Sequence, residues 1–238
     1  MEMSIDTFRE TFRRPFQFRE FLDQTWMIAR VSMVPTLLVS IPFTVLVAFT
    51  LNILLREIGA ADLSGAGTAF GTVTQLGSIV TVLVVAGTGA TAMCADLGAR
   101  TIRDELDALR VMGVDPVYRL VVPRVLAATI VAVSLVSLVT FVGLVGSFAF
   151  AVFVQHVTPG AFVAGLTLFT GLPDIILGLV KGALFGLSAS LIACYKGMSV
   201  RKGPQGVGNA VNETVVYSFI ALFVINIIAT AVYYTSAK

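Results

Sequence analysis

Apolar residues fall into five long blocks along this chain, and the segments between the blocks carry nearly all of the charged side chains. Residues 31–55 contain no charge, and as a helix they would be about 38 Å long, more than the roughly 30 Å hydrocarbon core of a bilayer. Because the blocks are continuous rather than alternating, they do not predict the strands of a membrane barrel. The pattern predicts membrane-spanning helices at residues 28–55, 64–95, 120–155, 174–195 and 212–236.

Residues 157–173 are also apolar, but they are interrupted by Pro159, Gly160, Gly165 and Gly171. We interpret this segment as an extracytoplasmic elbow. A sixth span is the less favoured alternative, because it would leave almost no connection before the next helix. With five spans, thirteen of the 16 Lys and Arg residues fall on one side of the membrane. The positive-inside rule then predicts a multi-pass plasma membrane protein with a cytoplasmic N-terminus and an extracytoplasmic C-terminus.

Residues 1–26 combine aromatic and charged side chains without a continuous apolar run, so they do not predict a cleavable signal peptide. Aromatic residues, from Phe8 to Trp26, are interspersed with Arg9, Arg13, Arg14 and Arg19. This pattern is typical of an amphipathic helix in the cytoplasmic interface, and a frayed basic tail is the alternative. We therefore expect an N-terminal interfacial segment at 1–26 and a single membrane domain at 27–238.

The composition excludes several classes of protein. With 57% hydrophobic and 13% charged residues, the chain cannot be a soluble enzyme, a nucleic-acid-binding module or a disulfide scaffold. His156 is the only histidine, and Cys94 and Cys194 have no neighbouring metal ligands, so no metal site is predicted. No catalytic triad and no Gly-Lys-Ser/Thr loop is present. We expect no catalytic residue and no cofactor in this chain, so any ATP and Mg²⁺ would bind to a separate subunit.

The segment between the second and third spans carries the densest mixture of charges. Apolar residues recur at Ile102, Leu106, Leu109 and Met112, which predicts one apolar stripe on a short amphipathic helix at about 101–113. Gly113 is placed to end this helix. Its charged face suits docking to a partner that moves the membrane domain, and a solvated connector is the alternative. The candidate coupling residues are Arg103, Asp104, Glu105, Asp107, Arg110 and Asp115.

The fourth span carries small residues at every fourth position, namely Gly178, Gly182, Gly186 and Ser190. Such a stripe permits close helix packing, either within the chain or at a subunit interface. Lys181 lies in the same span, where a charge is costly unless it is paired or hydrated. We consider two interpretations of Lys181, contact with a polar head group or partner, and a side chain that snorkels outwards.

The second span is rich in glycine and threonine and has the largest hydrogen-bonding capacity of the five. We predict that it lines a substrate cavity, although tight packing explains its glycines equally well. The candidate cavity residues are Thr74, Gln75, Ser78 and Thr88, together with Lys181.

The run GATAMCADLGARTIRDELDALRVMGVDPVYRLVVPRVLA resembles the signature region of the MlaE/YrbE permease family. The strings RRPFQFREFLDQTW and KGPQGVGNAVNETVVYSFIALFVIN look like the A-type YrbE subunits of actinobacterial mammalian-cell-entry (Mce) lipid import systems. This resemblance implies an all-α integral membrane fold with an N-terminal interfacial helix, five transmembrane helices and a cytoplasmic coupling helix. The implied partners are a B-type YrbE permease, a cytoplasmic ATP-binding-cassette (ABC) ATPase dimer and a hexamer of MCE proteins.

The chain differs from the bacterial MlaE pattern within the second span. An Arg-Glu pair of that pattern corresponds here to Thr74 and Gln75, and another membrane arginine corresponds to Thr88. Uncharged side chains would suit a less charged lipid, so a sterol is the favoured cargo, with fatty or mycolic acids as alternatives. Two other functions stay open, a non-transporting membrane scaffold for the MCE proteins and a secondary lipid transporter. No nucleic acid partner is expected.

Overall fold

The computed structural model describes residues 17–57, 59, 64–154, 158–169, 171–201 and 203–236, and all of the regular structure in these residues is helical. Residues 1–16 of the expected interfacial segment, and His156 just before the expected elbow, lie outside the described residues. The elements are α2 (Phe18–Glu57), α3 (Ser64–Gly71), η2 (Thr72–Leu76), α4 (Gly77–Val84), η3 (Val85–Ala90), α5 (Thr91–Ile102), α6 (Glu105–Val111), η4 (Val117–Val121), α7 (Val122–Phe153), α8 (Pro159–Phe169), α9 (Leu172–Met198) and α10 (Pro204–Ser236).

Five helical segments in the described part of the chain are long and apolar enough to cross a membrane. They are Phe18–Leu55, Thr72–Ile102, Val117–Phe153, Leu172–Met198 and Pro204–Thr235. The predicted all-helical fold with five spans is therefore confirmed. Each helix extends beyond the charge-free block that predicted it, because charged residues at the ends continue the helix outside the apolar layer.

The first span begins earlier than expected and without a break near residue 26. Helix α2 runs continuously from Phe18 to Glu57, because no proline or glycine occurs in it before Pro35. Pro35 and Pro42 both lie inside the helix. Residues 18–26 are therefore the first turns of the spanning helix, not part of a separate interfacial helix.

The second span is a chain of α-helical pieces joined by two wide π-helical turns, η2 and η3. Threonine hydroxyls along it donate to carbonyl oxygens four residues earlier, as in Thr72 to Thr68 at 2.8 Å and Thr81 to Gly77 at 2.7 Å. These bonds satisfy the hydroxyls where no water is available. Wide π turns of this kind are often found at functional sites.

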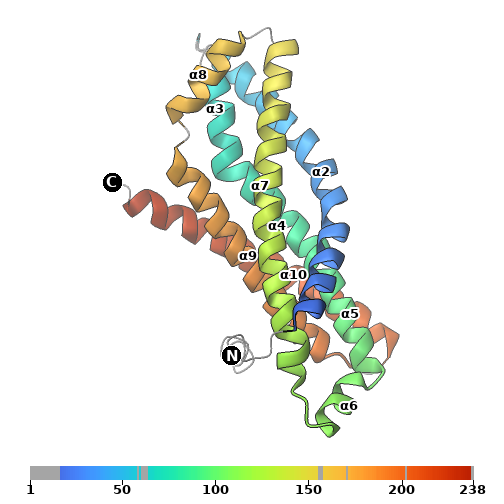
Figure 1. Cartoon of the computed structure of the whole chain (residues 1–238). Helices are drawn as coiled ribbons and strands as arrows, with labels where there is room; N and C mark the ends of the chain where they lie inside the picture. The colour runs from blue at the N-terminus through green and yellow to red at the C-terminus, as the bar shows by residue number, and fades with distance from the viewer. Residues whose placement is uncertain are drawn as a thin grey trace.

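The expected elbow is itself largely a helix, α8, which packs against α3 at one end of the molecule (Figure 1). Its 11 residues are too few to cross a bilayer, which needs about 20. Figure 1 also shows α6 at the opposite end, beyond the ends of the long helices.

Helix α7 lies between α2 and α9 and packs against both (Figure 1). The small-residue stripe of α9 faces α7, and a Cβ atom added at Gly186 would lie 2.6 Å from both Ala128 O and Thr129 Cα. A Cβ atom added at Gly182 would lie 3.2 Å from Val133 Cα, whereas one added at Gly178 would meet only a Val136 methyl group, at 3.7 Å. The stripe therefore packs within the chain, and its fourth member, Ser190, is fully buried.

Helix α2 buries a second stripe of small polar residues, consisting of Ser32, Thr36, Ser40 and Thr44, none of which is exposed. A Cβ atom added at Gly143 of α7 would lie 2.7 Å from a Thr72 methyl group and 3.0 Å from a Thr44 methyl group. The first three spans therefore approach closely at Gly143. Small residues allow this approach, since lipid tails provide no hydrophobic force that would drive helices together.

Candidate functional site

A short helix is present where the sequence predicts the coupling helix, but it is shorter than expected. Helix α5 continues to Ile102, the chain turns at Arg103 and Asp104, and α6 then spans only Glu105–Val111. Asp104 has a φ of 56°, a left-handed conformation that Asp tolerates better than most residues. Gly113, with a φ of 74°, follows the end of α6. The expected single helix over 101–113 is therefore wrong, because a left-handed residue divides it.

The candidate coupling charges are largely engaged with one another. Arg103 Nε lies 2.7 Å from Glu105 Oε1, and Arg110 Nη1 lies 2.9 Å from Asp107 Oδ1. All four side chains are at least 42% exposed. Asp115 has a different role, because its Oδ1 accepts the backbone N–H of Val117 at 2.8 Å and supports the start of η4. Exposed ion pairs are worth about 1 kcal/mol or less, so a partner's charges could replace these pairs at little cost.

The apolar stripe of the coupling region is also shorter than predicted. Leu106 is buried and Leu109 is partly buried, and both belong to a small cluster formed with the bases of α5 and α7. Met112, by contrast, is 67% exposed, and its neighbour Val111 is 89% exposed. The helix ends just before Met112, so this side chain no longer follows the helical stripe. We call Val111 and Met112 the apolar tip of α6.

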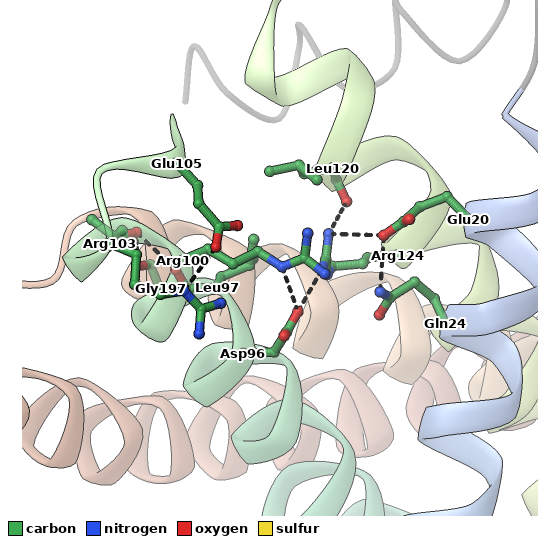
Figure 2. Close-up of polar contacts among 11 residues, drawn as sticks. Glu20, Gln24, Asp96, Leu97, Arg100, Arg103, Glu105, Leu120, Arg124 and Gly197 are labelled. Carbon is green, nitrogen blue, oxygen red and sulfur yellow. Dashed lines mark hydrogen bonds and ion pairs between the residues drawn. The ribbon is translucent and has the colours of Figure 1, made fainter. Parts of the chain in front are cut away.

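A buried arginine joins three helices beside the coupling region, and the sequence analysis did not single it out (Figure 2). Arg124, in the first turn of α7, is fully buried. Its Nη2 donates to Asp96 Oδ2 of α5 at 2.5 Å, and its Nη1 donates to Leu120 O at 2.9 Å and lies 3.8 Å from Glu20 Oε1 of α2. We call Glu20, Asp96 and Arg124 the Arg124 cluster.

The polar neighbours of this cluster extend it along α2 and α5. Gln24 donates its Nε2–H to Glu20 Oε1 at 3.0 Å, and Arg100 Nε lies 3.3 Å from Asp96 Oδ2. A signal for the cluster was present in the sequence, because Asp96 ends one charge-free block and Arg124 precedes the next. Their pairing could not be read from that signal alone.

The predicted cavity residues do not converge on one cavity. Thr74 is buried, and its backbone carbonyl accepts a hydrogen bond from Lys181 Nζ at 3.3 Å. Ser78 is also buried, and its Oγ has no hydrogen-bond partner among the described residues. Thr88 instead faces α2, where its Oγ1 lies 3.1 Å from Ser32 Oγ. The structure therefore brings Thr74 and Lys181 together and separates Thr88 from them.

Lys181 is fully buried and does not snorkel outwards. No carboxylate in the described part of the chain lies within ion-pair distance of its Nζ atom. The backbone carbonyl of Thr74, in the wide turn η2, accepts a hydrogen bond from this atom, so a backbone dipole holds the Lys181 side chain.

Gln75 faces a different neighbour, helix α10. It lines a groove of about 280 Å³ together with polar and apolar side chains of that helix, namely Asn226, Ile227, Thr230, Ala231 and Tyr234. The Oδ1 atom of Asn226 is buried without a partner among the described residues. A second groove, of about 300 Å³ and mainly apolar, lies between η2, α7, α8 and α9, with Asp174 at its edge. Both grooves lie at the lower limit of typical ligand sites, which have volumes of about 300–1,000 Å³.

The described residues contain no group of three or more His, Cys, Asp or Glu side chains that could hold a metal ion. Cys94 and Cys194 are both free and buried. The features that stand out are therefore a projecting charged helix, a buried ion cluster at its base and polar groups inside the spans. Together with the five long apolar helices, they describe a multi-pass membrane protein whose charged helix projects from one end.

Comparison with known proteins gives the family. Residues 21–232 match the family model described as Permease MlaE, so this chain belongs to the MlaE permease family. A probable ABC transporter permease protein of Synechocystis sp. is 31% identical over 215 residues, which cover 87% of this chain and 79% of that protein. A protein with the same description from Rickettsia typhi is 33% identical over 66% of this chain, and the alignment spans 60% of the rickettsial protein.

A third relative is named for a lipid. The intermembrane phospholipid transport system permease protein MlaE of Haemophilus influenzae is 27% identical over 76% of this chain and 69% of its own length. The family and these relatives identify the chain as a permease subunit of an ABC transporter, which is not itself the catalytic subunit.

Proposed function

We propose that this chain is one permease half of an ATP-driven lipid importer in the plasma membrane. In this proposal α6 lies in the cytoplasm and docks on an ABC ATPase dimer that binds the ATP and Mg²⁺. A B-type YrbE permease forms the other half, and a hexamer of MCE proteins delivers lipid from outside. The resemblance of the sequence to A-type YrbE subunits supports this set of partners.

The apolar tip of α6 is the observation that carries the docking proposal. Val111 is 89% exposed and Met112 67% exposed, at a position beyond the long helices where bilayer lipid would not cover them (Figure 1). An exposed apolar centre with polar and charged residues around it is typical of a protein interface. Two exposed ion pairs beside the tip, one on Asp107 and one on Glu105, could exchange partners when a subunit docks.

The polar groups within the spans support a lipid pathway. The groove at Gln75 is lined by uncharged polar atoms from two spans, and its volume of about 280 Å³ is at the lower limit for a ligand site. A second permease against α10 would enlarge such a groove. Because the groove lining has no charge, we propose a sterol as the favoured cargo, with an acyl lipid such as a phospholipid as the alternative. The name of the Haemophilus relative favours that alternative.

The proposal is tested by purifying the chain from its native membrane in mild detergent. We expect an ATPase, a second permease and MCE proteins to accompany it, and mass spectrometry of extracted lipid to find a sterol enriched over the bulk membrane. If a phospholipid or fatty acid were enriched instead, the proposed ATP-driven transporter would stand, but its cargo would not be a sterol. Recovery of the chain alone, under conditions that preserve other membrane complexes, would contradict the ATP-driven mechanism.

A further inference from the structure

The Arg124 cluster lies at the base of the segment that carries the coupling helix. Asp96 precedes the end of α5 by six residues, about 9 Å of helix, and Arg124 lies in the first turn of α7. Their contact therefore joins two residues that are 28 positions apart and closes a loop that contains the end of α5, α6, η4 and the connecting turns. Helix α6 is joined to the membrane spans only through the end of α5 and the start of α7, so any force on α6 reaches the spans through these two segments.

Glu20 adds a third helix to this closed loop. Its Oε1 atom lies 3.8 Å from Arg124 Nη1, and Gln24 holds the same oxygen at 3.0 Å from one turn further along α2 (Figure 2). The carboxylates of Glu20 and Asp96 are about 30% and 29% exposed, whereas the guanidinium between them is not exposed at all. A planar guanidinium can engage two carboxylates at once, which a lysine ammonium does less well.

Burial makes this junction stiff. If α2 or α5 moved away from α7, it would leave a charged guanidinium in the interior with one carboxylate fewer, which is strongly unfavourable. Arg124 Nε has no partner among the described residues, so the buried guanidinium depends on Asp96, Glu20 and the Leu120 carbonyl for compensation. The ends of α2, α5 and α7 are therefore expected to shift together.

We propose that Glu20, Asp96 and Arg124 are positioning residues that make the first span follow the coupling helix. This inference rests on the proposed function, because it requires an ATPase that moves α6. It adds a route for that movement: from α6 through the end of α5 and the start of α7 to Arg124, and from Arg124 through Glu20 to α2. Helix α2 in turn contacts the polar second span at Ser32 and Thr88.

The test uses the purified, complete transporter reconstituted in vesicles. Glu20→Gln removes one charge from the cluster and leaves the Asp96–Arg124 pair intact. We expect the complex to assemble and to hydrolyse ATP at the wild-type basal rate, while the ATP consumed per lipid transported rises severalfold. A wild-type ratio in Glu20→Gln would overturn the proposal.

Arg100→Gln is the matched control. It also removes a charge that touches Asp96, but Arg100 lies on the same helix, four residues away, so no contact between helices is lost. We expect its ratio of ATP to lipid to match the wild type. A rise equal to that of Glu20→Gln would point to general loss of charge at this end of the molecule and would also overturn the proposal.

A distance measurement separates transmission from a merely structural role. Spin labels are attached at Asp23→Cys on α2 and Arg119→Cys in η4, both exposed positions, since the native Cys94 and Cys194 are buried. In the otherwise wild-type transporter, we expect the distance between the two labels to be the same with and without ATP. In Glu20→Gln we expect the separation to change with nucleotide.

The alternative outcomes are distinguishable. A nucleotide-dependent separation in the wild-type background would contradict the proposal, even if Glu20→Gln failed to assemble. Identical distributions in wild type and Glu20→Gln would show that the cluster does not hold α2. If the wild-type complex neither hydrolysed ATP nor moved lipid, the proposed function itself would fail, whatever the cluster does.

Discussion

Gly186 shows how strongly single residues determine the packing of this bundle. A methyl group there would lie 2.6 Å from a backbone carbonyl and a Cα atom of α7, and backbone atoms cannot move aside as a flexible side chain can. Gly178 belongs to the same stripe two turns away, yet the nearest atom to its added methyl group is a valine side chain at 3.7 Å. The sequence showed the stripe, but only the structure shows which positions require glycine.

We therefore predict opposite effects of two alanine substitutions on the same helix face. Gly186→Ala should lower the free energy of unfolding by about 2 kcal/mol through overpacking. Gly178→Ala should be neutral or slightly stabilising, because alanine favours the helix by about 0.5–1 kcal/mol. Thermal unfolding of the purified chain in detergent measures both, and equal losses at the two positions would contradict the packing described for Gly186.

Lys181 is the other residue whose environment the sequence could not define. The Lys-Gly sequence in an apolar block left two interpretations, and the structure buries the side chain completely against the carbonyl of Thr74. A charge buried with one backbone acceptor contributes little to stability, since the desolvation cost offsets the hydrogen bond.

Substitution of Lys181 should accordingly depend on shape more than on charge. We predict that Lys181→Met, which fills nearly the same volume, keeps the unfolding free energy within about 1 kcal/mol of wild type or raises it. Lys181→Ala should lower it by about 3 kcal/mol because it leaves a cavity. A large loss in Lys181→Met, measured by the same thermal unfolding, would mean that the ammonium group itself holds η2 to α9.

At the scale of elements, the coupling region shows what periodicity can and cannot predict. The spacing of Leu106 and Leu109 predicted a short amphipathic helix, and the structure has one. The left-handed conformation of Asp104 and the exposure of Met112 could not be predicted, because both depend on how α5 and α6 meet. The wide turns η2, η3 and η4 likewise carry no periodic signal.

The charges of α6 provide a test at this scale. Asp107→Arg removes the exposed ion pair between Asp107 and Arg110, so it should change the free energy of unfolding by about 1 kcal/mol or less. If α6 docks on an ATPase, the same reversal should uncouple ATP hydrolysis from lipid transport in reconstituted vesicles. Glu213→Arg, which reverses another exposed ion-paired carboxylate on α10, is the control and should stay coupled. Normal coupling in Asp107→Arg would argue against docking through this face.

At the scale of the whole molecule, the fold was largely predictable and the site was not. Five long apolar blocks, four of them free of charge and one interrupted by Lys181, predicted five spans, because charged side chains are costly within the bilayer. The Arg124 cluster and the divergence of Thr74, Gln75 and Thr88 were not predictable, because they depend on how each helix is rotated about its axis. The N-terminal boundary also differed, since α2 passes residue 26 unbroken.

Five spans and the distribution of basic residues predict the orientation of the molecule in the membrane. We predict that a cysteine introduced at Ala108 in α6 is labelled by a membrane-impermeant thiol reagent only after the cells are opened. A cysteine at Thr158, before α8 at the opposite end, should be labelled in intact cells. Both positions are exposed. The reverse labelling pattern would place α6 outside the cell and exclude docking on a cytoplasmic ATPase.

The most direct test of the central claim is photocrosslinking from the apolar tip of α6 in the native membrane. A photoreactive side chain is introduced in place of Met112, and a second chain carries it at Thr158 as the control. We predict that Met112 yields an adduct with an ABC ATPase, identified by mass spectrometry, and that Thr158 yields none. The absence of an ATPase adduct at Met112, with the chain present in the membrane at normal levels, would contradict the account.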